Sequence, residues 1–216
     1  MDLELVEPKD VEKAECFEVT ETEAPVLIKL GELMIQKCTE WGGIGLAAPQ
    51  IGIKKKMFVW QVGEDERGRN FQIVFNPKYF KDGKEVRMLE GCLSYKADHF
   101  IVERYKYITA VFYTFYEGKF LKISKPISGI RAVVFQHETD HVNGTTIAMK
   151  GEKLDEEKNK EFIENIRKNE GLPPGARAGE DAPAGGVGGG AAGYSFTPNP
   201  DPPKENENGS IKKERQ

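Results

Sequence analysis

The apolar residues between positions 25 and 41 recur every three or four positions. This spacing places them on one side of a helix and leaves the polar residues on the other side. The pattern predicts an amphipathic helix over residues 25–41, whose first-turn Pro25 is compatible with a helix start. Cys38 falls on the apolar stripe, so we expect it to be a small buried hydrophobic residue.

Shorter segments rich in β-branched and aromatic residues follow, and turn sequences separate them. Such segments are typical of strands, and two that lie close in sequence predict a hairpin. We expect one hairpin whose second strand ends at Asn76-Pro77, a further turn at Asp82-Gly83, and a second hairpin that turns at Glu117-Gly118. The expected strands are residues 56–62, 71–77, 84–89, 107–115 and 119–124.

A second helix is expected after Pro126, beginning near Ser128. One stripe of this helix starts with aliphatic residues and ends in two imidazoles at steps of three and four. The residues of this stripe are Ile130, Val133, Val134, His137 and His141. Because the expected strands precede this helix and do not alternate with helices, we predict an α+β fold in which antiparallel β-sheets pack around a central helix.

The two ends of the chain lack these patterns. Residues 1–24 predict an irregular arm, and residues 154–168 predict a charged helix with a narrow apolar stripe. From residue 171 onward Gly, Pro and charged residues dominate, and this composition cannot offset the entropy lost on ordering. We therefore expect one folded domain over residues 1–170 and a disordered tail over residues 171–216.

Charge and cysteine content narrow the function classes. A net charge of -4 over 216 residues does not provide the basic face that direct nucleic-acid binding requires. No apolar run approaches the roughly 20 residues that span a membrane. The three cysteines contain no CxxC pair, which fits a reducing cytoplasm better than a disulfide framework. We expect a cytoplasmic protein that does not insert into a membrane.

The candidate chemistry centres on residues 137–141, which read HETDH and fit the pattern HExxH. Residues four apart lie on the same side of a helix, so His137 and His141 can reach one ion while Glu138 addresses a water molecule. Two hydrogen-bonded histidines on a buried helix are the competing interpretation, and the motif alone does not choose between them.

Two other segments bear on this choice. Residues 42–52 are rich in small residues and present Gln50, but they lack the Lys-Ser/Thr of a P-loop and the strand-turn-helix order of a dinucleotide-binding loop. Cys92 by itself could be a small buried strand residue. Together with the two histidines it makes a three-ligand set for Zn²⁺ or a similar divalent ion, with a fourth position left for water.

These segments resemble the three signatures of the peptide deformylase family, in the family's order. They read GIGLAAPQ at 43–50, EGCLS at 90–94 and QHETDH at 136–141, and the resemblance covers roughly residues 32–144. It implies that residues 1–170 are a catalytic domain that hydrolyses the formyl group from the N-terminal formylmethionine of nascent polypeptides and releases formate. Fe²⁺ is the implied metal, and Zn²⁺, Ni²⁺ or Co²⁺ could replace it. The implied partners are N-formylmethionyl nascent peptides, with transient ribosome association.

The resemblance also assigns roles to single residues. The metal ligands that it implies are Cys92, His137 and His141. Glu138 would take a proton from the attacking water and return it to the departing amine. The side-chain amide of Gln50 and the backbone N–H of Leu93 would stabilise the charge that develops on the formyl oxygen.

The resemblance further implies that the peptide lies extended against Ile44, Gly45 and Gly91. Its methionine side chain would enter an apolar pocket. The residues of that pocket would be Ile44, Met88, Ile130, Val133 and Val134. Core packing is the competing interpretation of the last three. Arg104 would pair with Glu90 or Asp140 and support the metal ligands, unless it is a solvated surface residue.

Other interpretations remain at this point. His99 could be taken for a ligand, but Cys92 already fills that place, so we expect His99 to face the peptide or solvent. A metalloprotease with this motif would need a further ligand downstream, for which the candidates are Glu152, Glu156 and Glu157. A noncatalytic peptide-binding or metal-binding relative would need neither Glu138 nor Gln50.

Overall fold

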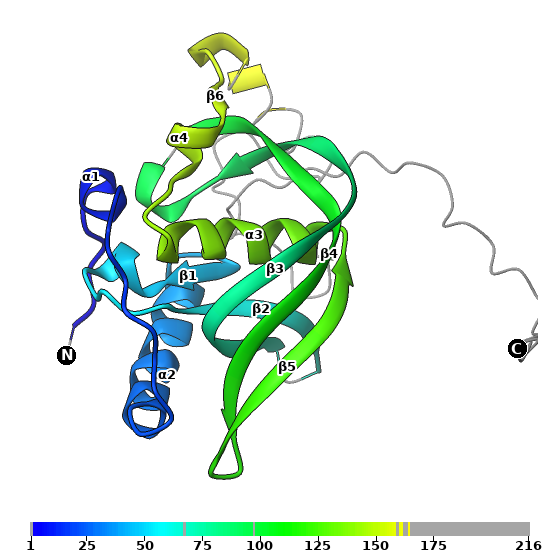
Figure 1. The fold of residues 1–216 in the computed structure, drawn as a ribbon. Coiled ribbons are helices and arrows are strands. Elements are labelled where there is room, and N and C mark those ends of the chain that lie inside the picture. The colour runs from blue at the N-terminus through cyan, green and yellow to red at the C-terminus, as the bar shows by residue number, and fades with distance from the viewer. Residues whose placement is uncertain (1, 67, 97, 159, 162–163, 165–216) are drawn as a thin grey trace, which may run out of the picture.

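The computed structural model describes residues 2–66, 68–96, 98–158, 160–161 and 164. Its centre is one antiparallel sheet with the strand order β1-β2-β3-β4-β5, and β6 pairs with β4 (Figure 1). The strands are β1 (Gly45–Ala47), β2 (Met57–Asp65), β3 (Gly68–Gly91), β4 (His99–Tyr116), β5 (Lys119–Ser128) and β6 (Glu152–Lys153). The helices are α1 (Pro8–Val11), α2 (Ala24–Glu40), α3 (Ile130–Val142) and α4 (Ile147–Lys150), with 3₁₀ turns η1 (Ala48–Ile51) and η2 (Leu93–Tyr95). The predicted antiparallel strands are confirmed, in one sheet instead of several.

The strand β3 is longer than the sequence predicts, because it continues through both expected turns. Asn76 adopts a positive φ of 50° and Gly83 one of 75°, and the pairing of β3 with β4 shifts register beside each of them. The side chain of Asn76 bonds the backbone N–H and carbonyl of Val19, both at 2.8 Å. The turn residues therefore bend one long strand at irregular positions and do not end it.

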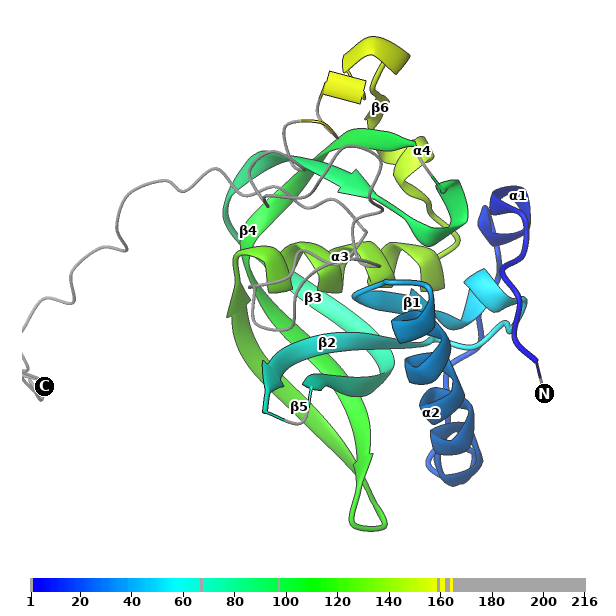
Figure 2. The ribbon, with the colours of Figure 1, turned by 180° about the vertical axis from the view of Figure 1, so that it is seen from behind.

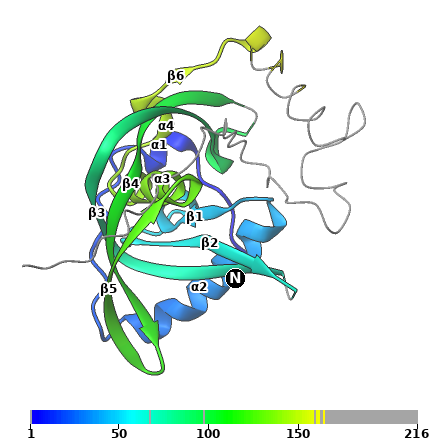
Figure 3. The same cartoon turned by 90° about the vertical axis from the view of Figure 1, so that its right-hand side faces the viewer.

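The helix α3 lies inside the curve of the sheet, as Figures 1 and 3 show from two directions. It begins at Ile130, after Gly129 with a φ of 63°, two residues beyond the predicted start, because β5 continues through Pro126 to Ser128. Proline is tolerated there because β5 is an edge strand. Phe135 anchors the helix by contacting the rings of Phe58, Trp60 and Phe112 with centroid distances of 5.3, 5.5 and 5.7 Å.

The helix α2 confirms the first predicted helix to within one residue at each end. Cys38 and Met34 are both 0% exposed and pack with Leu46 and Val59 of the first two strands. The helix lies beside β1 and β2 in the opposite view (Figure 2). The stripe on α2 thus closes a second part of the core, separate from the one around α3.

The N-terminal segment is more ordered than an irregular arm, because it contains α1 and buries Val11 completely. At the other end Glu156–Lys158, Lys160, Glu161 and Glu164 are helical, and the rest of the predicted helix 154–168 lies outside the described residues. So does the predicted tail 171–216. Among the described residues, none of the helices has the length and apolar character needed to cross a bilayer.

Candidate metal centre

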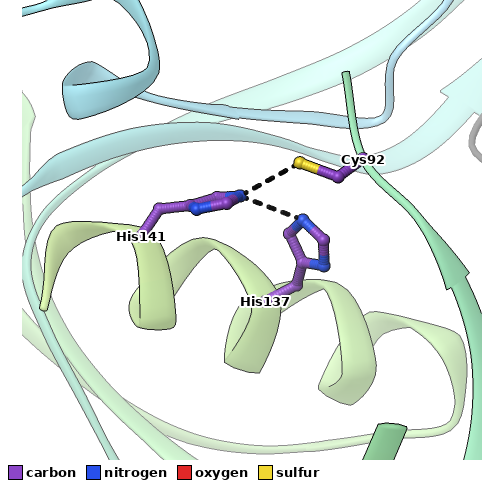
Figure 4. Close-up of side chains that lie close together, drawn as sticks. All are labelled: Cys92, His137 and His141. Atoms are coloured by element: carbon purple, nitrogen blue, oxygen red, sulfur yellow. Dashed lines mark hydrogen bonds between the residues drawn. The ribbon is translucent and has the colours of Figure 1, made fainter. Parts of the chain in front are cut away.

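The sheet and α3 bring three potential metal ligands to one point (Figure 4). His141 Nε2 lies 3.1 Å from His137 Nε2 and 3.3 Å from Cys92 Sγ. The histidines come from adjacent turns of α3, and Cys92 directly follows the last residue of β3. One ligand atom from each residue lies within 4.8 Å of the others, and all three residues are buried. The helix α3 and the end of the strand β3 thus hold the three donor atoms in one cluster.

The cluster fits a divalent cation. A tetrahedral ion with the usual bond lengths separates two imidazole nitrogens by about 3.3 Å and a nitrogen from a thiolate sulfur by about 3.6 Å. The observed separations of 3.1 and 3.3 Å are close to these values. Three protein donors also leave one position of such an ion for a water or a substrate oxygen, so the donor set suits hydrolysis.

Glu138 lies next to the cluster with an exposed fraction of 3%. Burial raises the pKa of its carboxyl group to about 7, although a divalent cation at the cluster would act in the opposite direction. Its Oε2 atom has no hydrogen-bond partner among the described residues. A buried carboxylate oxygen without a partner is costly, so its position is best explained by a water or substrate group.

Gln50 faces the cluster from η1. Its Oε1 atom accepts a hydrogen bond from the Ala47 N–H at 2.9 Å, which fixes the orientation of the amide. Its Nε2 atom then points to Cys92 Sγ at 3.4 Å and Ser94 Oγ at 3.1 Å. Gln50 therefore presents a donor to the space beside the thiol.

A small cavity connects these groups. Its lining residues are Gly43, Ile44, Gly45, Gln50, Gly91, Cys92, Leu93, His137 and Glu138. Every one of the three signature segments contributes to it. Four residues of the predicted methionine pocket do not line it, namely Met88, Ile130, Val133 and Val134. Of these, Ile130 is 37% exposed and lines a wider opening with Pro126 and Arg131.

A series of buried charged residues contacts the Nδ1 side of the His137 ring. Its Nδ1 atom lies 2.8 Å from Glu90 Oε2, and Arg104 donates to both oxygens of Glu90 at 2.6 and 2.8 Å. Arg104 also donates to Asp140 at 2.5 Å. Burial opposes ionisation of Glu90, but the charge and hydrogen bonds of Arg104 outweigh it and lower the pKa of Glu90 to about 2. Arg104 is 0% exposed, so it pairs with both predicted partners and is not a solvated residue.

The family model described as polypeptide deformylase matches residues 5–158. The chain belongs to the polypeptide deformylase family. Family members named peptide deformylase include one from Thermotoga neapolitana, 38% identical over 117 residues that cover 54% of this chain and 66% of the relative. Another, from Carboxydothermus hydrogenoformans, is 36% identical over 130 residues that cover 60% of this chain and 80% of the relative.

A solved structure agrees with these relatives. The crystal structure of the peptide deformylase from Thermotoga maritima matches with a TM-score of 0.61 and 31% identity, and the match covers 68% of this chain and 96% of that chain. The chain is therefore an enzyme of a family of metal-dependent hydrolases, and its cluster of Cys92, His137 and His141 is a candidate metal site.

The structure of this deformylase family member also decides part of one expectation. His99 is 8% exposed, so it does not face solvent, and the alternative that it faces the peptide stays a prediction. As the first residue of β4 it pairs with Gly91, and its carbonyl accepts a hydrogen bond from the Leu154 N–H at 2.9 Å. His99 is not among the residues that line the cavity, although its strand partner Gly91 is.

Two residues near the site were missed by the sequence reasoning. Lys150 lies 2.8 and 3.0 Å from the two carboxylate oxygens of Asp140, and Ser94 accepts the hydrogen bond from Gln50. Ser94 belongs to the second signature of the deformylase family and could have been selected on that basis. Lys150 gives no such signal, because only the turn of the chain after α3 brings it beside Asp140.

Proposed function

We propose that the chain removes the formyl group from N-formylmethionyl nascent polypeptides and releases formate. Membership of the deformylase family supports this reaction. The observation that carries the proposal is that Glu138 and Gln50 line one cavity together with Cys92 and His137, which form the ligand cluster with His141. A binding protein would need neither the carboxylate nor the amide, whereas hydrolysis of an amide needs both a proton carrier and a donor for the carbonyl oxygen.

The metal would be held by Cys92 Sγ and by the imidazole nitrogens of His137 and His141, with the HExxH segment of the central helix α3 supplying two of the three ligands. We propose Fe²⁺ as the physiological ion, with Zn²⁺, Ni²⁺ or Co²⁺ able to take its place. When bound, the ion supplies Lewis acidity that polarises the formyl carbonyl and increases the acidity of water. Glu90 accepts the Nδ1 proton of His137 and thereby directs Nε2 to the cluster.

Glu138 moves the proton. Its carboxylate accepts a proton from the attacking water and delivers it to the departing amine nitrogen. The unpartnered Oε2 atom is the group available for both transfers. Burial keeps bulk water away from this carboxylate, so the proton passes to the leaving group and is not lost to solvent.

Gln50 and Leu93 stabilise the formyl oxygen. Ala47 orients the Gln50 amide so that Nε2 donates toward the cavity. Leu93, one residue after Cys92, also lines the cavity. Donors that are oriented before the reaction stabilise developing negative charge without reorganisation. We therefore assign these two groups to the oxyanion.

The peptide would lie extended beside β1, which pairs only with β2 among the described strands. Ile44, Gly45 and Gly91 line the cavity at this edge, where a further strand can hydrogen-bond. The methionine pocket over Met88, Ile130, Val133 and Val134 stays a prediction. So do action in the cytoplasm, the lack of direct nucleic-acid binding and transient ribosome association.

The metalloprotease alternative is not favoured. Its candidate ligands Glu152, Glu156 and Glu157 are all exposed, and Glu152 lies on β6. The donors that come together in the described part of the chain are instead Cys92, His137 and His141. A Cys92→Ser variant separates the two functions, since the protease interpretation requires that it retain the metal.

The decisive experiment measures formate release from a formyl-Met peptide by anaerobically purified protein, with metal analysis of the same sample. Wild type should release formate with about one equivalent of metal, and Cys92→Ser should lose both. A matched acetyl-Met peptide controls for general amidase activity. Absence of formate release by protein that carries its metal would contradict the proposed reaction.

A further inference from the structure

The N-terminal segment 6–14, called here the arm, contacts the signature segment that contains Gln50 and residues that closely follow the other two signature segments. The Val6 N–H donates to the carbonyl of Gln50 at 2.9 Å, and the Lys13 N–H donates to the carbonyl of Gly144 at 2.6 Å. Gly144 follows α3, which carries the two histidines. Between these contacts, Glu12 reaches Tyr95, the last residue of the η2 turn that begins after Cys92.

Glu12 joins two of these segments through one carboxylate oxygen. The Tyr95 hydroxyl donates to Glu12 Oε1 at 3.0 Å, and the Thr146 hydroxyl donates to the same atom at 3.3 Å. The Tyr95 hydroxyl also has the Thr146 hydroxyl as a hydrogen-bond partner at 2.9 Å, so its single proton is shared between Thr146 and Glu12. Thr146 is 0% exposed. Hydrogen bonds to an ionised carboxylate are stronger than those between neutral groups, so Glu12 is suited to hold the two segments together.

The segments that contain Tyr95 and Thr146 are each hydrogen-bonded to the backbone of a metal ligand or of the residue beside one. The Tyr95 N–H donates to the carbonyl of Cys92 at 2.9 Å, and the Thr145 N–H donates to the carbonyl of Asp140, the residue before His141, at 2.9 Å. The thiol and the imidazoles come from parts of the chain that are far apart in sequence. Their relative position therefore depends on contacts that join those parts. These include the direct Tyr95–Thr146 hydrogen bond and the two hydrogen bonds that Glu12 accepts from Tyr95 and Thr146.

The arm fits against the loop after α3 without spare space. Gly144 has a φ of +69°, and a Cβ atom there would lie 2.7 Å from the Ala14 nitrogen and 2.9 Å from the Ala14 oxygen. Val11 is 0% exposed and anchors the arm in the core. The Tyr95 ring packs edge-on against Phe100 at 5.4 Å, so both ends of the Glu12 contact are held by packing.

We propose that the arm is a clamp for the metal centre, and that Glu12 is a positioning residue that fixes Cys92 relative to His137 and His141. The inference rests on the proposed metal site. Ligands that are held in place before the ion binds lose less entropy on coordination, and residues outside the ligand set commonly affect metal affinity by about 10- to 100-fold. Because Glu12 acts through Tyr95 and Thr146, its effect belongs at the lower end of that range.

The test is a titration of the metal-free full chain with Co²⁺, followed by chelator competition and by the thiolate-to-cobalt absorption band. Glu12→Ala and Tyr95→Phe should each weaken Co²⁺ binding by about tenfold and reduce or shift the band. Glu12→Gln should remain within about threefold of wild type, because an amide oxygen still accepts both hydroxyl protons. The matched control is Glu18→Ala, which removes a glutamate whose ion pairs among the described residues are long, at 4.0 Å to Lys56 and 3.9 Å to Lys78.

The outcomes separate the clamp from the metal site itself. Wild-type protein without a thiolate band would overturn both. A normal wild-type band with unchanged Co²⁺ affinity in Glu12→Ala and Tyr95→Phe would overturn the clamp alone. Equal losses in Glu12→Gln and Glu12→Ala would also overturn it, because the hydrogen bonds could not then be the cause. If Glu12→Ala does not fold, Tyr95→Phe decides, since it removes the hydroxyl that bonds Glu12 and Thr146 and keeps the half-buried ring.

Discussion

Gly45 and Glu138 are in such close contact that no side chain fits between them. A Cβ atom at position 45 would lie 2.7 Å from the carboxyl carbon of Glu138 and 2.9 Å from its Cγ atom. The strand β1 therefore forms one wall that fixes the position of the proposed proton carrier. A bound peptide that added to this strand would lie beside the same carboxylate.

Gly45→Ala should displace Glu138 and lower kcat by about 10² or more, because proton transfer depends on the position of the carboxylate. Metal content should stay normal, since the three atoms nearest to the added Cβ all belong to Glu138 and none to a metal ligand. The measurements are formate release and metal analysis. Gly63→Ala is the matched control, because a Cβ atom there meets nothing within 4 Å. Equal activity of the two variants would contradict the close contact.

Glu138→Gln should retain the metal and lose at least about 10² in kcat, as expected for a missing acid and base. The amide has nearly the shape of the carboxylate, so the buried site should stay folded. The expected result is strongly reduced formate release with an unchanged metal-to-protein ratio. Turnover near the wild-type rate would remove Glu138 from the mechanism.

Gln50→Ala should lower kcat by roughly 10² to 10³, the usual effect of removing one oxyanion donor. The loss should fall on kcat and not on KM alone, because the hydrogen bond strengthens as charge develops on the oxygen. Steady-state kinetics over a range of formyl-Met peptide concentrations measure both constants. A change confined to KM would assign Gln50 to substrate binding.

Arg104→Met should destabilise the metal-free protein by about 3–5 kcal/mol, because Glu90 and Asp140 would remain buried without their shared partner. Urea unfolding followed by circular dichroism measures this free energy. Arg87→Met is the control on the neighbouring strand, since its side chain is 66% exposed and pairs with Glu152 at 3.7 Å. Similar unfolding free energies for the two variants would mean that the buried charges do not depend on Arg104.

Lys150→Met should have a smaller effect, about 1 kcal/mol or less, because the lysine side chain is 34% exposed and solvent screens its pairing with Asp140. The free energy of unfolding should fall, because Arg104 alone would then compensate the carboxylates of Glu90 and Asp140. Lys153→Met is the matched control, because it removes an exposed pair with Asp98 at 2.8 Å. A larger loss in the control than in Lys150→Met would contradict a role for Lys150 in the buried network.

The sequence by itself predicted the two main helices, the antiparallel strands and the candidate residues of the site. Helical spacing predicted α2 to within one residue at each end, and period and motif together placed His137, Glu138 and His141 on one helix. These features are local, because hydrophobic periodicity and the i, i+4 relation depend only on neighbouring residues. The three signatures added Cys92 and Gln50, which come from other parts of the chain.

Only the tertiary structure decided how these parts meet. The local turn signals at Asn76 and Gly83 predicted the ends of strands. In the structure β3 continues through both positions because it pairs with β4, and sheet hydrogen bonds outweigh a local turn preference. The same pairing buries His99. The contacts of Glu12 with Tyr95 and Thr146 and of Lys150 with Asp140 join residues without any shared sequence pattern. Such contacts depend on the packed positions of separate segments, which local spacing does not encode.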